Sequence, residues 1–388
     1  MHDMMVYAVF LIFTGAAIIS TFALFTRQSM LVGYILLGGV LGPNGVGAIP
    51  DTAIVTQAGN IGILFLLFLV GLHLHPQKLL QMFGKTLWIA IVSSLLFALM
   101  GYGVARLFQY DVMQSMIIGA SMMFSSTIIG LKLLPTTVLH HRHTGELVIS
   151  ALLLQDIIAI LTLLWLHGMS SGDASLKQVI LIIVSVPGLI VFAYLMQRFV
   201  LLYLLKKFDR IQEYIFLLSI GWCVGMGELA EMLGLSASIG AFIAGVAVAS
   251  HPISRYISEN LKPLRDFFLV VFFFSIGAHF DFTYVPQIIL PAIVLAVIAL
   301  LMKPFVFQLL FRQMKEKSGV SWEVGWRLGQ MSEFSLLIAY MVQRVGLASD
   351  QISYLIQAAT IITFIFTSYM VVLRYPSPLA FSDKLRRD

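Results

Sequence analysis

One charged side chain, Asp156, lies in the middle of an apolar stretch with no other charged residue within five positions on either side. Gln155 is the only neighbour along the chain that could share a hydrogen bond with it. A carboxylate at membrane depth costs at least about 2.5 kcal/mol and is usually functional. Because burial favours the neutral form and a nearby cation favours the ionised form, one such carboxylate can exchange protons for cations. The competing interpretation is a buried aspartate that only pins helices together.

Lys303 is a second buried charge, and its position suggests a partner for Asp156. It stands in an apolar run and is followed directly by Pro304, which removes a backbone donor and weakens the helix there. We therefore predict that Lys303 pairs with Asp156 and couples the two ions. The alternative is that Lys303 snorkels to the interface along its aliphatic stem.

Two apolar runs are interrupted at their centres by polar residues. The first carries Ser125, Ser126 and Thr127, and the second carries Arg327 and Glu333. Interrupted helices offer free backbone N–H and C=O groups as ion ligands where they line a cavity. The two runs are the fifth and the twelfth, an odd offset that is typical of inverted-topology repeats. Ordinary helix packing through small residues is the competing explanation.

The elements that must position these residues are membrane helices. Of 388 residues, 59% are hydrophobic and 11% are charged, which excludes a soluble globular protein, where about a quarter are charged. A span needs about 20 apolar residues. Thirteen apolar runs can be read, with no room left for a soluble domain: 4–25, 31–49, 58–74, 86–105, 112–134, 145–167, 178–197, 213–230, 236–250, 266–279, 284–311, 320–343 and 351–373.

The basic residues predict the orientation of these spans. With the N-terminus outside, 19 Lys and Arg residues fall in cytoplasmic breaks and 3 on the other side, as the positive-inside rule requires. The sequence therefore predicts a multi-pass protein with a cytoplasmic C-terminus and membrane lipids around it. The net charge of +5 is a topology signal, and we expect no nucleic-acid partner.

Several motifs in order along the chain resemble one transporter family. They include Gly33 to Gly47, Gly62 to Leu72, Ser125 to Gly130, Leu152 to Asp156, Gly234 to Gly245, Phe272 to Gly277 with Asp281, and Gly329 to Phe334. Together they resemble the cation:proton antiporter-2 family of monovalent cation:proton antiporters, and within it most closely the membrane domain of the Kef-type potassium/proton antiporters.

This resemblance implies an all-α polytopic membrane protein with about 13 transmembrane helices, inverted-topology repeats and two crossed broken helices, a sodium/proton antiporter-like fold. It implies one transmembrane antiporter domain over 1–388. Core helices would include 58–167 and 266–373, and dimerisation helices 1–49 and 178–250. The implied ion-binding residues are Asp156, Gln155, Ser125, Ser126 and Thr127, and the implied charge-pairing residues are Lys303, Glu333 and Arg327.

The implied function is antiport of a monovalent cation against protons by a homodimer in the inner cell membrane, serving pH homeostasis. Gln155 followed by Asp156 resembles potassium-linked members, whereas two aspartates are typical of sodium exchangers. A sodium/proton antiporter of the same fold and, from another class, a ligand-gated cation channel are the alternatives. The sequence predicts no enzyme, no bound metal and no cofactor beyond the transported ions. Kef-type proteins usually continue into a nucleotide-binding regulatory domain, so a regulatory domain or subunit outside this chain is expected.

Overall fold

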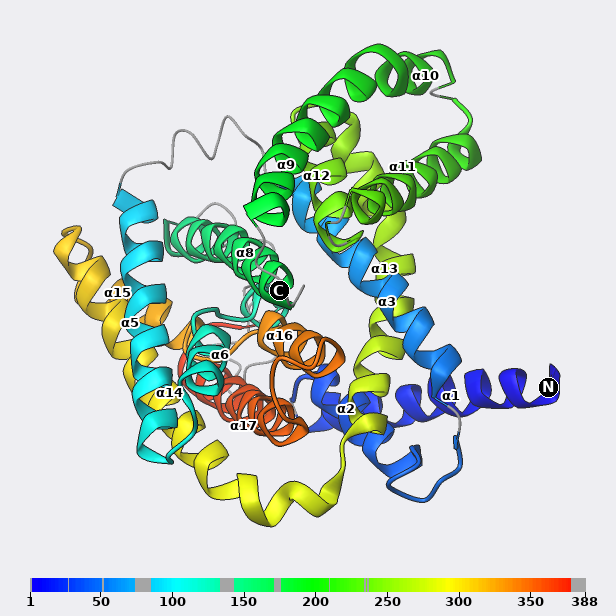
Figure 1. Cartoon of the computed structure of the whole chain (residues 1–388). Helices are drawn as coiled ribbons and strands as arrows, with labels where there is room; N and C mark the ends of the chain where they lie inside the picture. The colour runs from blue at the N-terminus through cyan, green and yellow to red at the C-terminus, as the bar shows by residue number, and fades with distance from the viewer. Residues whose placement is uncertain are drawn as a thin grey trace. The chain divides into compact units, whose positions relative to one another are not determined.

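The computed structural model describes residues 2–26, 28–50, 52–73, 85–132, 143–170, 176–208, 210–233, 235 and 237–377. The regular elements in this part of the chain are helices (Figure 1). The predicted all-α fold is therefore confirmed for these residues.

Each of the thirteen predicted apolar runs corresponds to one helix or, where the run is interrupted, to a series of shorter ones. The two interrupted runs form α6 with α7 and α15 with α16, and the run 178–197 forms α9, which continues beyond the predicted end into a π-helical turn and α10. The described helices are α1 (His2–Phe25), α2 (Met30–Leu41), α3 (Ala53–His73), α5 (Lys85–Leu107), α6 (Val112–Met122), α7 (Thr127–Lys132), α8 (His143–Ser170), α9 (Leu176–Met196), α10 (Leu202–Lys207), α11 (Gln212–Met232), α12 (Ala237–Ala249), α13 (Ile253–His279), α14 (Val285–Gln313), α15 (Ser318–Arg327), α16 (Glu333–Arg344) and α17 (Asp350–Arg374).

The surface of these helices suits a lipid environment. Within the described residues, seven helices are long and apolar enough to cross a membrane. Large apolar side chains point outward on them, with Phe22 64% exposed and Leu301 62% exposed. Extended apolar surface of this kind marks a membrane or partner contact in a folded protein. Six of the basic residues behind the predicted orientation lie outside the described residues: Arg27, Lys78, Arg142, Lys384, Arg386 and Arg387.

The chain divides into two compact units, each made of discontinuous segments. The first contains Met1–Pro50, Met82–Ala159 and Ile276–Asp388, and the second contains Asp51–Gln81 and Ile160–Ser275. All residues predicted to take part in ion exchange belong to the first unit. The predicted division into core helices (58–167 and 266–373) and dimerisation helices (1–49 and 178–250) stays a prediction.

The first unit is built around a core to which α5, α8, α14 and α15 all contribute. Phe97 of α5 meets Phe307 of α14 edge to face, with ring centroids 5.3 Å apart, and Figure 1 shows the two helices running side by side. Val148 of α8 and Val324 of α15 complete this apolar cluster. The core thereby fixes α14, which carries Lys303, against α15, which leads into the second break.

Gly325 of α15 allows α15 to approach α14 closely at Pro304. A Cβ on Gly325 would lie 2.5 Å from the Pro304 carbonyl oxygen, and one on Gly329 would lie 3.0 Å from the Pro304 ring. Only glycine fits at the Gly325 contact, because real Cβ atoms essentially never approach other atoms so closely, and the contact at Gly329 would be tight for any larger residue. Lys303, next to this contact, is therefore held beside the end of α15.

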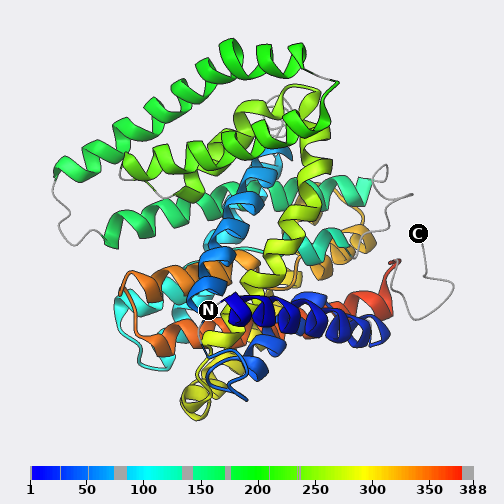
Figure 2. The ribbon, with the colours of Figure 1, turned by 90° about the vertical axis from the view of Figure 1, so that its right-hand side faces the viewer.

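The second unit packs α3, α11 and α12 together, and α9 lies against α12. Cys223 lies in its apolar core, together with Phe68 and Met226. In Figure 2, α9, the π-helical turn (Gln197–Leu201) and α10 follow one another without a gap as one bent helical segment, drawn in green. None of the predicted ion-exchange residues belongs to this unit.

Gly245→Ala is expected to destabilise the second unit, because α3 and α12 touch through glycine. A Cβ at this position would collide with the carbonyl oxygen of Phe68. Overpacking of this kind costs about 1–3 kcal/mol, which should outweigh the higher helix propensity of alanine. Thermal unfolding of the purified protein in detergent measures the loss. The matched control is Gly221→Ala in α11, where a new Cβ meets nothing within 4 Å, and equal unfolding temperatures for the two variants would contradict the prediction.

Candidate ion-binding site

Two helical breaks form the centre of the first unit. The first separates α6, which ends at Met122, from α7, which begins at Thr127, and the second separates α15, which ends at Arg327, from α16, which begins at Glu333. Serine side chains compete with helical hydrogen bonds at such points. Ser126 Oγ accepts a hydrogen bond from the Ile129 N–H at 3.1 Å, and Ser332 caps α16 by accepting from the Phe334 N–H at 3.1 Å.

Direct hydrogen bonds join the two breaks, although they are about two hundred residues apart in sequence. Ser125 Oγ donates to the Leu328 carbonyl at 2.7 Å, and Gln330 Nε2 donates to the Ser126 carbonyl at 3.3 Å. Ser335 Oγ donates to the Ser121 carbonyl. The breaks therefore meet, and backbone N–H and C=O groups that lie outside the helical hydrogen-bond pattern are brought together there, where side chains bind them.

Asp156 reaches this meeting point from α8 and is 2% exposed. Its carboxylate accepts from Thr127 Oγ1 at 3.0 and 3.3 Å. The neighbouring Gln155 accepts from the Ser125 N–H through Oε1 at 3.1 Å. The residues predicted from the sequence to bind cation and proton thus lie together, with Asp156 and Gln155 on α8 and the hydroxyl residues on the first break.

Glu333 brings a second carboxyl group to the same residue of the first break. Its Oε1 accepts from the Thr127 N–H at 3.2 Å, and its side chain is 2% exposed. Thr127 therefore donates to Asp156 through its hydroxyl and to Glu333 through its backbone. Two buried carboxylates this close repel each other unless a proton or a cation lies between them. The pair can therefore hold either ion.

Lys303 lies beside the same breaks but contacts backbone rather than Asp156. Its Nζ donates to the Phe124 carbonyl at 2.6 Å and to the Gln330 carbonyl at 2.9 Å, and lies 5.0 Å from the centre of the Phe97 ring. Among the described residues, no ion pair joins Lys303 to Asp156. The predicted pairing of the two is not formed in this conformation, and a coupling role for Lys303 stays a prediction.

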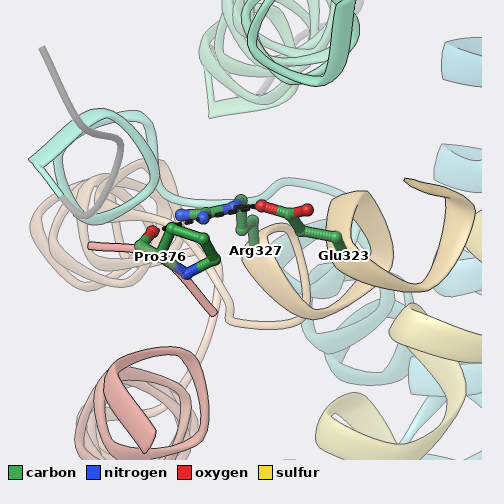
Figure 3. Close-up of polar contacts among 3 residues, drawn as sticks. All are labelled: Glu323, Arg327 and Pro376. Carbon is green, nitrogen blue, oxygen red and sulfur yellow. Dashed lines mark hydrogen bonds and ion pairs between the residues drawn. The ribbon is translucent and has the colours of Figure 1, made fainter. Parts of the chain in front are cut away.

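Arg327 contacts Glu323 and Pro376, as Figure 3 shows. Its Nε and Nη2 donate to Glu323 Oε1 at 3.0 and 2.8 Å, and Nη2 also donates to the Pro376 carbonyl at 2.7 Å. The guanidinium is thus held between the last turn of α15 and the segment after α17. These contacts tie two elements of the first unit together, and the predicted role of Arg327 in ion coupling stays a prediction.

The comparison with protein families supplies the identity. A family model described as "Sodium/hydrogen exchanger, transmembrane" matches residues 9–373. The chain belongs to the sodium/hydrogen exchanger family. This is a family of transporters and not of enzymes, and its members are multi-pass membrane proteins. Cation/proton exchange is accordingly the activity class that the comparisons support for this exchanger.

Relatives and a solved structure are similar over most of the exchanger. The iron transporter MagA of Paramagnetospirillum magneticum is 26% identical, with 88% of this chain and 79% of MagA covered. The glutathione-regulated potassium-efflux protein KefC of an Enterobacter species is 26% identical, with 94% of this chain and 59% of KefC covered. The sodium proton antiporter MjNhaP1 of Methanocaldococcus jannaschii has a TM-score of 0.70 at 17% identity, with 96% of this chain and 97% of that one covered.

These matches confirm the resemblance to Kef-type antiporters and the antiporter-like fold. The exchanger spans about six tenths of the length of that KefC.

Arg327→Met is expected to destabilise the exchanger by about 1–3 kcal/mol, because it leaves two half-buried acceptors, the Glu323 carboxylate and the Pro376 carbonyl, without their donor. The Glu323 side chain is 19% exposed and keeps some hydration, whereas the Arg327 side chain is 0% exposed. The control is Arg255→Met, which removes a surface pair with Glu259 whose side chains are 89% and 66% exposed. Such a surface pair contributes about 0–1 kcal/mol. Thermal unfolding in detergent compares the two, and a loss for Arg255→Met as large as that for Arg327→Met would count against the buried role.

Sequence reasoning missed three residues of this site. Gln330 donates across the breaks, Thr363 of α17 accepts from the Met331 N–H at 3.1 Å, and the Phe97 ring faces the Lys303 ammonium. The signal for Gln330 was an amide in the interrupted run, three positions before Glu333. Thr363 and Phe97 stand in ordinary apolar helices, and no sequence pattern distinguishes them.

Proposed function

We propose that this chain exchanges a monovalent cation, with K⁺ favoured, against H⁺, and that both ions compete for Asp156. The observation that carries the proposal is that two buried carboxyl groups, those of Asp156 and Glu333, both accept hydrogen bonds from the half-buried Thr127. A proton or a cation relieves the repulsion between them, and the empty, doubly charged state is disfavoured at membrane depth.

Competition at one carboxylate is sufficient to couple the two fluxes. The cation-loaded site and the protonated site are both neutralised, whereas a bare charge has no partner in a low-dielectric barrier. The breaks supply what a dehydrated cation needs, namely carbonyl oxygens beside a carboxylate. Lys303 donates a hydrogen bond to a carbonyl of each break. A movement of one break relative to the other would therefore shift the ammonium and change the electrostatic environment of Asp156.

The ligand chemistry favours an alkali cation. The groups gathered at Asp156 are carboxylate, hydroxyl and amide oxygens, and hard oxygen ligands suit cations of this kind, whereas iron sites usually include imidazole or thiolate. This donor set favours a hard cation over iron, although MagA carries the name of an iron transporter, and the choice of a monovalent cation rests on the family, which is described as sodium/hydrogen exchangers.

The preference for K⁺ rests on Gln155 beside Asp156 and on the similarity to KefC. The family is described as sodium/hydrogen exchangers, so exchange of Na⁺ against H⁺ is the alternative. We further propose a homodimer in the inner cell membrane with the N-terminus outside and the C-terminus in the cytoplasm. A role in pH homeostasis and control by a regulatory domain or subunit complete the proposal.

The test is proton flux in proteoliposomes that contain the purified exchanger. K⁺, Na⁺, Li⁺ and Rb⁺ are compared at several pH values, with internal pH read from a fluorescent dye. The proposal predicts cation-driven proton movement that saturates with cation, reverses when the proton gradient is reversed and is strongest for K⁺.

Other outcomes are informative. Strongest movement with Na⁺ would replace K⁺ by the sodium alternative. Cation flux without proton movement, and without saturation, would replace antiport by the ligand-gated channel. No movement with any of the four cations would refute the proposed exchange.

A further inference from the structure

Gln330 carries a buried side-chain oxygen that has no hydrogen-bond partner among the described residues. The residue lies in the second break and its side chain is fully buried, at 0% exposure. Nε2 donates to the Ser126 carbonyl at 3.3 Å. Among the described residues, Oε1 has no hydrogen-bond partner. Buried acceptors almost always have a hydrogen-bond partner in folded proteins, so this oxygen is a candidate to bind a ligand.

The contact with Ser126 fixes which end of the amide carries the oxygen. If the amide were turned over, its oxygen would face the Ser126 carbonyl oxygen, and two acceptors would repel each other. The donor end is therefore engaged and the acceptor end is available. The backbone carbonyl of Gln330 is also occupied, because it accepts from Lys303 Nζ at 2.9 Å. Oε1 is thus the acceptor of this residue that remains for an ion.

The same peptide unit links Gln330 to the carboxyl pair. The Ser126 carbonyl that Gln330 contacts belongs to the peptide whose N–H, on Thr127, donates to Glu333. The hydroxyl of Thr127 then donates to Asp156 at 3.0 Å. Gln330 from the second break and Asp156 from α8 therefore approach the first break at adjacent residues.

We propose that Gln330 Oε1 is a ligand of the transported cation, contributed by the second break, and that it determines how strongly the cation binds. This inference rests on the proposed function. An amide oxygen is a neutral, hard ligand that replaces one water of an alkali cation, and the number and strength of such oxygens set the preference among alkali cations. A proton on Asp156 needs no such ligand, so Gln330 acts on the cation branch of the exchange alone.

The chain offers a matched control in α17. Gln357 is also buried, at 3% exposure, and its Oε1 likewise has no hydrogen-bond partner among the described residues. Its Nε2 donates to Ser353 Oγ, on the same helix, at 3.1 Å. Gln357 thus shares the chemistry and burial of Gln330, but its amide contacts Ser353 of α17 rather than either break.

The test compares Gln330→Met with Gln357→Met in proteoliposomes, because methionine keeps the length of the side chain and removes the amide oxygen. Proton flux is measured against K⁺ concentration at a fixed pH. For Gln330→Met, the KM for K⁺ is expected to rise at least about tenfold, equivalent to 1.4 kcal/mol, with the maximal rate changed less than about twofold. The pH dependence of the maximal rate should stay that of the wild type. Gln357→Met should keep the wild-type KM.

A binding measurement covers the case in which Gln330→Met is inactive. KCl should raise the unfolding temperature of the purified wild-type protein relative to choline chloride, because a ligand that binds the folded state stabilises it. Gln330→Met should lose this rise, and the control Gln357→Met should retain it.

Two results would overturn the inference: an unchanged KM with a lower maximal rate, or an equal KCl-dependent rise in wild type and Gln330→Met. Failure of the proposed function is recognised separately, because the wild-type vesicles would then show no cation-driven proton flux.

Discussion

Asp156→Asn is expected to abolish cation-driven proton movement, to the level of protein-free vesicles, while the exchanger stays folded. Asparagine has nearly the same shape as aspartate, and its carbonyl oxygen can still accept the hydrogen bond from Thr127 Oγ1, which is 3.0 Å long in the wild type. It can neither take up a proton nor neutralise a cation at neutral pH. Both halves of the exchange lose their shared group.

The stability of Asp156→Asn should equal or exceed that of the wild type. Glu333 contacts the same threonine, so removal of one carboxylate removes a repulsion between like charges. Thermal unfolding in detergent and proton flux in vesicles, measured on one preparation, separate the two effects. Inactivity together with unchanged or raised unfolding temperature is the expected combination.

The control for this substitution is Asp266→Asn in α13, an acid-to-amide change at a side chain that is 56% exposed. It should leave proton flux at the wild-type level. Near-normal exchange by Asp156→Asn would remove this carboxylate from the mechanism, and an equal loss in Asp266→Asn would show that the assay responds to acid substitutions in general.

Lys303→Met is expected to have the second largest effect and to weaken both folding and transport. The ammonium donates to the Phe124 carbonyl in one break and to the Gln330 carbonyl in the other. Both acceptors are in non-helical backbone, so neither has a helical donor to return to. Each buried acceptor left without a donor costs about 1–3 kcal/mol. Methionine also relieves the cost of burying a charge, and we therefore expect a net loss of about 1–3 kcal/mol.

The proton flux of Lys303→Met should fall by more than the loss of folded protein alone explains, since the lysine joins the two breaks that present ligands to the cation. Lys303→Arg keeps a cation at this position and should recover part of the flux. Lys262→Met, at an exposed position of α13, should change stability by less than about 0.5 kcal/mol. If Lys303→Met unfolded at the wild-type temperature and transported at the wild-type rate, the lysine would be a passive core residue.

Much of the fold could be predicted from the sequence because a membrane constrains the chain strongly. In lipid every backbone group must be satisfied internally, so apolar runs of sufficient length become helices. Each predicted run overlaps a described helix, and the interruptions around Ser125 and around Gln330 are present, although α2 ends at Leu41 and α13 begins at Ile253, away from the predicted bounds 49 and 266. Polar residues are rare at the centre of an apolar run, and a helix break that binds an ion is one of the few structures that accommodates them. For this reason Asp156, Thr127 and Glu333 could be proposed as site residues from the sequence.

The partners within the site could not be predicted in the same way. Arg327 and Glu333 stand six positions apart in one interrupted run, and the sequence suggested a similar role for both. The structure places Glu333 on Thr127 and Arg327 between Glu323 and Pro376. The break between α15 and α16 changes the direction of the chain, so that helical periodicity no longer relates the faces of residues on its two sides.

The sequence by itself determined that this protein consists of membrane helices and which polar residues interrupt the apolar runs. Polar and charged side chains are costly in the hydrocarbon region of a membrane, so the few that stand within apolar runs are conspicuous. Only the tertiary structure decided that Lys303 holds two carbonyls in place of a carboxylate, and that Gln330 leaves its oxygen available. Those outcomes depend on which backbone groups two breaks, about two hundred residues apart, bring within about 3 Å of each other. Geometry at that scale follows from packing of the whole unit and is not encoded in any local run of residues.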